Sequence, residues 1–225
     1  GDGRLTVKTT VRPLIDSLPD LPRLGLQTVL DGEYDRVLWY GLGPHENYPD
    51  ICASARVGKY EASVEALHEP YVRPQENGAR GGIRALAVTN ALGLGFVVTG
   101  DVPFSFTAHD YTDEALTEAE HTYELEHENF TVLSLDYRHG GIGSNSCGPR
   151  PMEKYLLKLT GPVTYTLTFL PYDRQAISWP RRAGRNATQP DFYTNAAAGG
   201  TPPRPPNLMG GGYVHRTIDW QHAGA

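Results

Sequence analysis

The feature that most constrains the fold is a succession of short stretches in which apolar and polar residues alternate. They recur about ten residues apart, with Gly, Pro, Asn and Asp between them. Alternation with a period of two is typical of β-strands that bury one face, and this spacing favours an all-β sandwich. The predicted strands are 5–11, 23–30, 34–42, 82–89, 94–99, 102–107, 124–128, 130–137, 155–160 and 163–170.

Turn-forming residues between neighbouring strands predict four hairpins. They fall at 24–42, 82–99, 124–137 and 155–170. The segment 61–66 fits either one helical turn or an extended edge. The best helix is 110–119, where Thr112 suits the N-cap, and acidic residues follow it at the positive end of the helix dipole.

The composition changes after residue 172. Residues 173–225 hold runs of Pro, Gly and Arg without periodicity, so we expect a domain at 1–172 and a disordered or loosely attached tail at 173–225. Residue 5 already lies in an alternating stretch, which we interpret as an N-terminally truncated domain. A sandwich that lacks its first strands is expected to leave one sheet edge unpaired.

Charge and composition exclude several classes of partner. The formal net charge of the 225 residues is −6, so no nucleic-acid partner is expected. No apolar run approaches the roughly 20 residues that span a bilayer, so no membrane partner is expected. The only cysteines, Cys52 and Cys147, lie far apart, which favours a reducing, cytoplasmic location.

Three polar corners interrupt the predicted strands: the first corner at 39–50, the second at 69–78 and the third at 140–149. Rigid loops that carry aromatic rings and planar polar groups suit sugar binding. In the alternative interpretation, the same polar groups only hold their own backbone in place. The sugar-facing candidates are Asn47, Tyr48, Tyr71, Arg73, Gln75, Glu76, Asn77 and Asn145.

Catalysis by this chain alone has little support in the spacing of its residues. A retaining glycosidase needs two carboxyl groups about 5–5.5 Å apart. The corners hold four carboxylates, but nothing in the sequence fixes a pair, so we predict no catalytic residue here. These carboxylates are Glu46, Asp50, Glu69 and Glu76.

The sequence gives even less support for other kinds of chemistry. His121 and His127 lack a zinc spacing, and we predict no metal site. His109 beside Asp110 suits either an oriented general base or the start of a helix. Cys147 suits either a reactive thiol or a small residue in a tight loop.

The three corners together resemble a known family. Residues 39–50, 70–78 and 135–149 follow one another as in the C-terminal small-chain domain, or domain 5, of glycoside hydrolase family 2 β-galactosidases. The resemblance covers about residues 1–172. It implies a β-supersandwich akin to galactose mutarotases.

This resemblance also implies a function. The complete enzyme is a retaining β-galactosidase that hydrolyses terminal β-D-galactosides such as lactose, and it is expected to be an oligomer. Its catalytic glutamates, with Mg and Na ions, belong to a (β/α)₈ barrel, on the same polypeptide or a large subunit, that no segment here matches. This domain is then expected to shape the active-site mouth, to support assembly and to be inactive alone.

The third corner carries the expected substrate contacts. In some members a Trp on the matching loop forms part of the galactoside-binding surface. Cys147 stands at that position here, so an aromatic role is not carried over, and Asn145 and Cys147 remain as rim contacts. Ile51 also departs from the usual Arg.

Two alternatives stay open. One is a stand-alone carbohydrate-binding module built on the polar corners. The other is a mutarotase-like epimerase, although the catalytic His and Glu of mutarotases cannot be placed on a matching motif.

Overall fold

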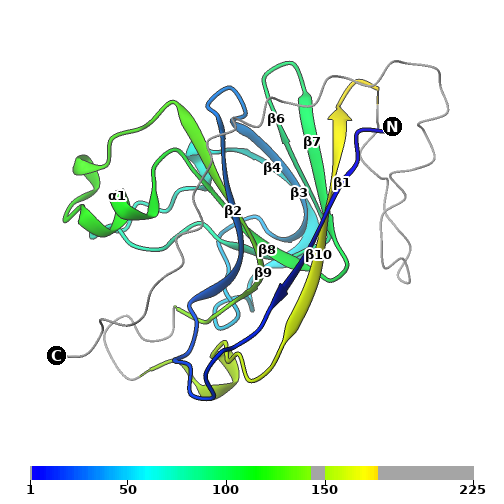
Figure 1. Ribbon diagram of the computed structural model, residues 1–225. Coiled ribbons are helices and arrows are strands. Elements are labelled where there is room, and N and C mark those ends of the chain that lie inside the picture. Colours follow the sequence, from blue (N-terminus) through cyan, green and yellow to red (C-terminus); the bar gives the residue numbers. More distant parts are fainter. Residues whose placement is uncertain (1, 143–149, 177–225) are drawn as a thin grey trace.

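The computed structural model describes residues 2–142 and 150–176 (Figure 1). This part of the chain forms an all-β sandwich of two antiparallel sheets, as predicted. The strands are β1 (Leu5–Val11), β2 (Arg23–Asp31), β3 (Arg36–Gly43), β4 (Arg56–Ser63), β5 (Arg80–Ile83), β6 (Ala85–Thr89), β7 (Leu94–Gly100), β8 (Phe104–His109), β9 (Phe130–His139) and β10 (Val163–Asp173). The helix is α1 (Asp113–Glu118), and short 3₁₀ turns are η1 (Glu65–Leu67), η2 (Thr122–Glu124) and η3 (Glu153–Tyr155).

The two sheets enclose one main hydrophobic core. The six-stranded sheet has the order β1-β10-β7-β6-β3-β4, and the four-stranded sheet the order β2-β9-β8-β5. Trp39 of β3 meets Phe106 of β8 edge-on, with 5.7 Å between ring centroids. Burying side chains of this size stabilises a fold by about 1.5–3 kcal/mol each, so the alternation seen in the sequence is what joins the sheets.

One predicted hairpin is confirmed and three are wrong. β6 and β7 pair across a turn at Asn90, whose side-chain oxygen accepts from the amides of Leu92 and Leu94. β2 instead pairs with β9, and β3 with β4 and β6. A turn signal predicts that the chain reverses, but it does not say which sheet the next strand joins.

The other errors have the same origin. Residues 124–128 contain no strand, and of 155–160 only Leu157 makes an isolated bridge, to Leu21. β10 pairs with β1 and β7, which lie far away in sequence. The predicted strand 82–89 is two strands, because the chain changes sheets at Arg84, between β5 and β6.

The short elements agree better with the sequence. Thr112 caps α1, and its hydroxyl accepts from the Ala115 amide at 3.1 Å. Segment 61–66 contains the end of edge strand β4 and the start of η1. The predicted boundary at 172/173 falls at the end of β10, whereas most of the predicted tail lies outside the described residues.

The outward face of the four-stranded sheet is the polar one. Thr107, His109, Ser134 and Asp136 are buried there, although they point away from the hydrophobic core. Figure 1 places α1 and its flanking loops beside this sheet. Buried polar groups need hydrogen-bond partners, so this face is a candidate for a polar functional site.

Candidate functional site

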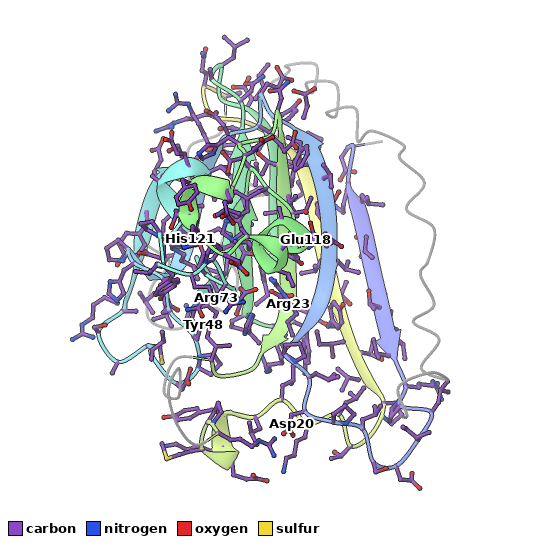
Figure 2. The ribbon with its side chains drawn as sticks, turned by 90° about the vertical axis from the view of Figure 1, so that its left-hand side faces the viewer. Asp20, Arg23, Tyr48, Arg73, Glu118 and His121 are labelled. Carbon is purple, nitrogen blue, oxygen red and sulfur yellow. The ribbon has the colours of Figure 1, made fainter. Side chains whose placement is uncertain are left out.

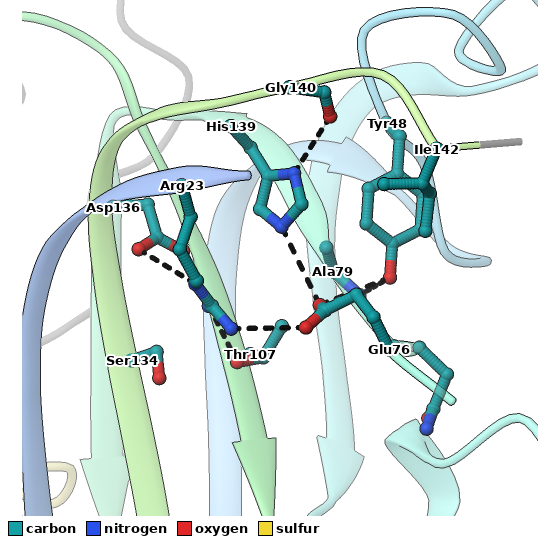
Figure 3. A network of polar contacts seen from close by, with 12 residues as sticks. Arg23, Tyr48, Glu76, Ala79, Thr107, Ser134, Asp136, His139, Gly140 and Ile142 are labelled. Atoms are coloured by element: carbon teal, nitrogen blue, oxygen red, sulfur yellow. Dashed lines mark hydrogen bonds and ion pairs between the residues drawn. The ribbon is translucent and has the colours of Figure 1, made fainter. Parts of the chain in front are cut away.

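A polar network centred on Arg23 lies on the outward face of the four-stranded sheet (Figure 3). Its guanidinium donates to both Asp136 oxygens, from Nε at 3.1 Å and from Nη2 at 2.6 Å. Nη1 donates to Glu76 Oε2 at 3.1 Å, and Nη2 also donates to Thr107 Oγ1 at 3.1 Å. The planar guanidinium thus joins two carboxylates from distant parts of the chain.

A bulge in β9, where Tyr137 is the extra residue opposite Leu24 and Gly25, sets the register at which Arg23 meets Asp136. The register between β2 and β9 shifts between Leu24 and Gly25. A Cβ at Gly25 would lie 2.4 Å from the Leu135 carbonyl oxygen, so only glycine allows the strands to approach this closely. Bulges of this kind redirect side chains.

Glu76 is more accessible than Arg23 or Asp136. Its side chain is 32% exposed, against 3% for Asp136. The Tyr48 hydroxyl donates to Glu76 Oε1 at 3.3 Å, and His139 Nε2 lies 3.6 Å from the same oxygen. His139 Nδ1 donates to the Gly140 carbonyl at 2.8 Å, which orients the ring towards Glu76.

The two carboxylates differ in their electrostatics. Burial alone would raise the pKa of Glu76, but the contact with His139 and the charge of Arg23 outweigh it, so the pKa is lowered. Burial also raises the pKa of Asp136, and there it outweighs the bonds from Arg23. Asp136 cannot meet a ligand because it is covered, so the two do not act as a hydrolytic pair on a sugar.

The first corner binds the second. Glu46 Oε2 accepts from the Gly78 amide at 2.8 Å, and its other oxygen accepts from the Tyr71 hydroxyl. Asn47 Oδ1 accepts from the Gly81 amide at 2.9 Å. These bonds agree with the interpretation that the polar side chains set the shape of the corner.

The first corner also binds the start of the third. Asp50 Oδ1 accepts from the Ile142 amide at 3.1 Å. A Cβ at Gly141 would lie 2.7 Å from Asp50 Cγ, so the backbone approaches the carboxylate closely. The Gly140 amide donates to the Pro22 carbonyl and the Gly141 amide to the Tyr155 carbonyl, both at 2.8 Å.

The candidate base His109 is a buried structural residue. Its Nε2 donates to the Asn77 carbonyl at 3.1 Å, and its ring stacks on Tyr111. Burial lowers the pKa of His109 to about 4. Asp110 bonds to His127 at 2.6 Å instead, which argues against the alternative of an oriented base at His109.

Apart from Glu76, the sugar-facing candidates among the described residues form two groups. Asn47, Tyr48 and Asn77 are buried and hold backbone groups or Glu76. Tyr71, Arg73 and Gln75 are exposed. Figure 2, which looks onto this side of the molecule, shows Arg73, Tyr48 and Arg23.

The predicted rim contacts Asn145 and Cys147 lie outside the described residues. Sequence reasoning missed Arg23 and His139 as partners of Glu76, and Asp136 as a partner of Arg23. The one local signal of this network was Asp136, a charged residue within the predicted strand 130–137.

Two further findings concern the described part of the chain. Within residues 2–142 and 150–176, no three His, Cys, Asp or Glu side chains gather closely enough to hold a metal ion. No helix in those ranges is long and apolar enough to cross a membrane.

Fold and network together define a β-sandwich domain whose three polar corners are bonded to one another. Residues 1–169 match the family model described as "Beta galactosidase small chain", and the chain belongs to this family. The resemblance found in the sequence is therefore confirmed.

Relatives named "Beta-galactosidase" support this assignment. The chain is 40% identical to that of Actinobacillus pleuropneumoniae over 157 residues, which are 69% of this chain and 15% of the relative. It is 39% identical to that of Pseudoalteromonas haloplanktis over 157 residues, 69% of this chain and 14% of the relative. For Vibrio cholerae the identity is 39% over 168 residues, 75% of this chain and 16% of the relative. The chain thus spans about 15% of the length of these relatives.

Proposed function

We propose that this chain supplies the small-chain domain of a retaining β-galactosidase that acts on terminal β-D-galactosides such as lactose. In this proposal the domain shapes the active-site mouth and supports assembly. The catalytic glutamates, with Mg and Na ions, belong to a barrel on the same polypeptide or a large subunit. Support comes from the names of the relatives and from the small share of each that the match covers.

The observation that carries the mouth-shaping role is the anchoring of the third corner. Asp50 accepts the Ile142 amide, and His139 donates to the Gly140 carbonyl, so the other two corners reach the start of this loop through the network. These bonds hold the start of the loop, residues 140–142. From the family resemblance, we propose that Asn145 and Cys147 contact the galactoside.

The accessible chemistry of the described residues also favours a supporting role. The network offers one partly exposed carboxylate, Glu76, whereas double displacement needs two facing carboxyl groups. The chain alone should therefore give no turnover of a chromogenic galactoside above the buffer blank. Turnover by the purified chain that survives repeated purification would refute the proposal.

The positioning role has its own test in the assembled enzyme. Asp50→Ala removes the acceptor for the Ile142 amide, and a misplaced loop can cost up to roughly 10²-fold in kcat/KM. His45→Ala is the matched control, because the His45 ring bonds to Ser54 within the same segment. Equal effects of both substitutions would contradict the assignment.

The two alternatives predict different measurements on the isolated chain. A stand-alone carbohydrate-binding module should bind galactose or lactose with millimolar or tighter affinity in titration calorimetry. A mutarotase-like epimerase should speed the optical rotation change of fresh α-galactose. We expect no acceleration, because the His139 side chain beside Glu76 is only 2% exposed.

A further inference from the structure

The protons on the ring of His139 link the polar network to the third corner. His139 is the last residue of β9 and directly precedes the described start of this corner, residues 140–142. Its side chain is 2% exposed, and the Tyr48 ring meets it edge-on with 5.0 Å between ring centroids. The number of protons on the ring therefore decides how its two buried nitrogens are satisfied.

Hydrogen bonding fixes the position of one proton. His139 Nδ1 lies 2.8 Å from the carbonyl oxygen of Gly140, and a carbonyl oxygen can only accept. Nδ1 must therefore carry a proton and donate it. In a neutral imidazole with this proton, Nε2 has none and presents only a lone pair.

The other ring nitrogen faces a carboxylate. Within residues 2–142 and 150–176, His139 Nε2 has no hydrogen-bond partner, and Glu76 Oε1 lies 3.6 Å from it (Figure 3). Glu76 is ionised at neutral pH, because its pKa lies below the ordinary value. A neutral ring would set a buried lone pair against this anion, whereas a ring with protons on both nitrogens forms an ion pair with it.

The charges of the network lead to the same protonation state. Arg23 balances one of the two carboxylates to which it donates, Asp136 and Glu76. Tyr48, which donates to Glu76, adds no charge. A positive His139 brings the sum over the four ionisable side chains to zero, and a neutral His139 leaves one unbalanced negative charge. An unbalanced buried charge is strongly destabilising.

The other titratable and charged groups near this ring do not supply the missing charge. Asp50 of the first corner accepts from the Ile142 amide, and its negative charge also favours a positive ring. His109 of β8 is neutral at pH 7, because burial lowers its pKa to about 4. Arg138 is exposed, and its guanidinium stacks on the neighbouring tyrosine ring.

A cavity gives protons a route to the buried ring. It measures about 210 Å³, and its lining includes His139, Tyr48 and Cys52. The lining also includes Pro49 and Arg138, which are exposed, so the cavity reaches the surface. The ring can therefore gain or lose a proton without unfolding of the network.

We infer that His139 is a positioning residue that holds the start of the third corner in place only as an imidazolium ion. The inference rests on the proposed function, in which this corner contacts the galactoside. With both nitrogens protonated, the ring joins the Gly140 carbonyl to Glu76. Loss of the second proton removes the ion pair and leaves the carboxylate unbalanced, so residues 140–142 lose this support. The stabilisation is present while the ring is charged and is lost as the pH rises, and galactoside binding weakens with it.

The first test is nitrogen-15 NMR of the histidine rings of the chain at pH 7, with His139→Gln to assign the signal. We expect both ring nitrogens of His139 to be protonated in the parent. In Glu76→Gln, one nitrogen should be unprotonated, because the carboxylate is gone and the new amide can donate to Nε2. A parent ring with one unprotonated nitrogen overturns the inference. The parent spectrum decides this by itself, so a variant that fails to fold does not obscure the result.

The second test is the pH dependence of KM for a chromogenic galactoside in the assembled enzyme between pH 6 and 9. Relative to His139→Gln, the KM of the parent should rise by about threefold or more across this range, with a smaller change in kcat. His121→Gln is the matched control, because this exposed ring lies beside Glu124 outside the network, and it should follow the parent.

The two tests separate the inference from the proposed function. Parallel pH profiles of the parent and His139→Gln overturn the inference and leave the proposed function intact. An assembly of the parent chain that does not hydrolyse galactosides overturns the proposed function, and the NMR spectrum then still reports the charge of the ring.

Discussion

The buried ring of His109 should make the fold sensitive to acid. The residue is 5% exposed, and burial lowers its pKa from 6.5 to about 4. Between these two pH values the unfolded chain binds a proton at His109 that the folded chain does not. Stability must therefore fall as the pH falls through this window. At about 1.4 kcal/mol per unit, His109 should cost about 3 kcal/mol by pH 4.

The perturbation is His109→Gln, whose amide nitrogen can donate to the same Asn77 carbonyl but does not titrate. The variant loses the ring stack on Tyr111, a cost that does not depend on pH. It should therefore be less stable than the parent at pH 7.5. The difference should shrink by up to about 3 kcal/mol as the pH approaches 4.

The assay is urea unfolding followed by far-ultraviolet circular dichroism between pH 7.5 and 4.5. The lowered pKa of Glu76 and the raised pKa of Asp136 also make the free energy of unfolding depend on pH. Both residues are present in the parent and in the variant. A stability difference that stays constant with pH would refute the reasoning.

His127→Gln is the control of opposite sign. The hydrogen bond to Asp110 raises the pKa of the exposed His127. Its stabilisation is complete below the unfolded pKa and is lost as the pH rises through the folded pKa. The difference between this variant and the parent should therefore widen, not shrink, on acidification.

Three further substitutions test the network and the fold by the same unfolding assay. Arg23→Met leaves Asp136 buried without its cation and should cost about 3–5 kcal/mol, whereas Arg174→Met, in an exposed ion pair, should cost less than about 1 kcal/mol. Equal costs would contradict this. Gly25→Ala places a Cβ against the backbone of β9 and should lower the free energy of unfolding by about 1–3 kcal/mol. An unchanged urea midpoint would contradict the close approach of β2 and β9 at this residue. Thr112→Ala removes the cap of α1 and should cost about 1 kcal/mol, with Thr112→Ser retaining most of it.

Strand positions were predictable because burial on one face imposes a period of two on any strand. β1, β7 and β9 therefore stand close to where the alternation put them. The pairing of strands was harder to predict, because the two strands within residues 24–42 belong to different sheets. Which sheet a strand joins depends on contacts across the whole core, such as Trp39 against Phe106, and no local pattern reports them.

The network was harder to predict than the strands. Glu76 was a candidate from the start, but Arg23 precedes it by 53 positions and Asp136 follows Arg23 by 113. Neither residue stands in a motif with a recognised chemistry. The bulge at Tyr137 also shifts the register of β9 against β2, so counting along β9 does not show that Arg23 meets Asp136.

Bonds between the corners explain why the sequence motifs that carry the resemblance form a set. Glu46 binds Gly78, Asp50 binds Ile142 and Tyr48 binds Glu76, so each motif supplies a partner that another motif needs. A carboxylate buried without its donors would cost more than the bond itself contributes, so the loss of one corner would leave unpaired groups in the others. The third corner therefore depends on residues more than 90 positions away. The geometry of its described start, residues 140–142, is therefore tied to the first corner and, through His139, to Glu76.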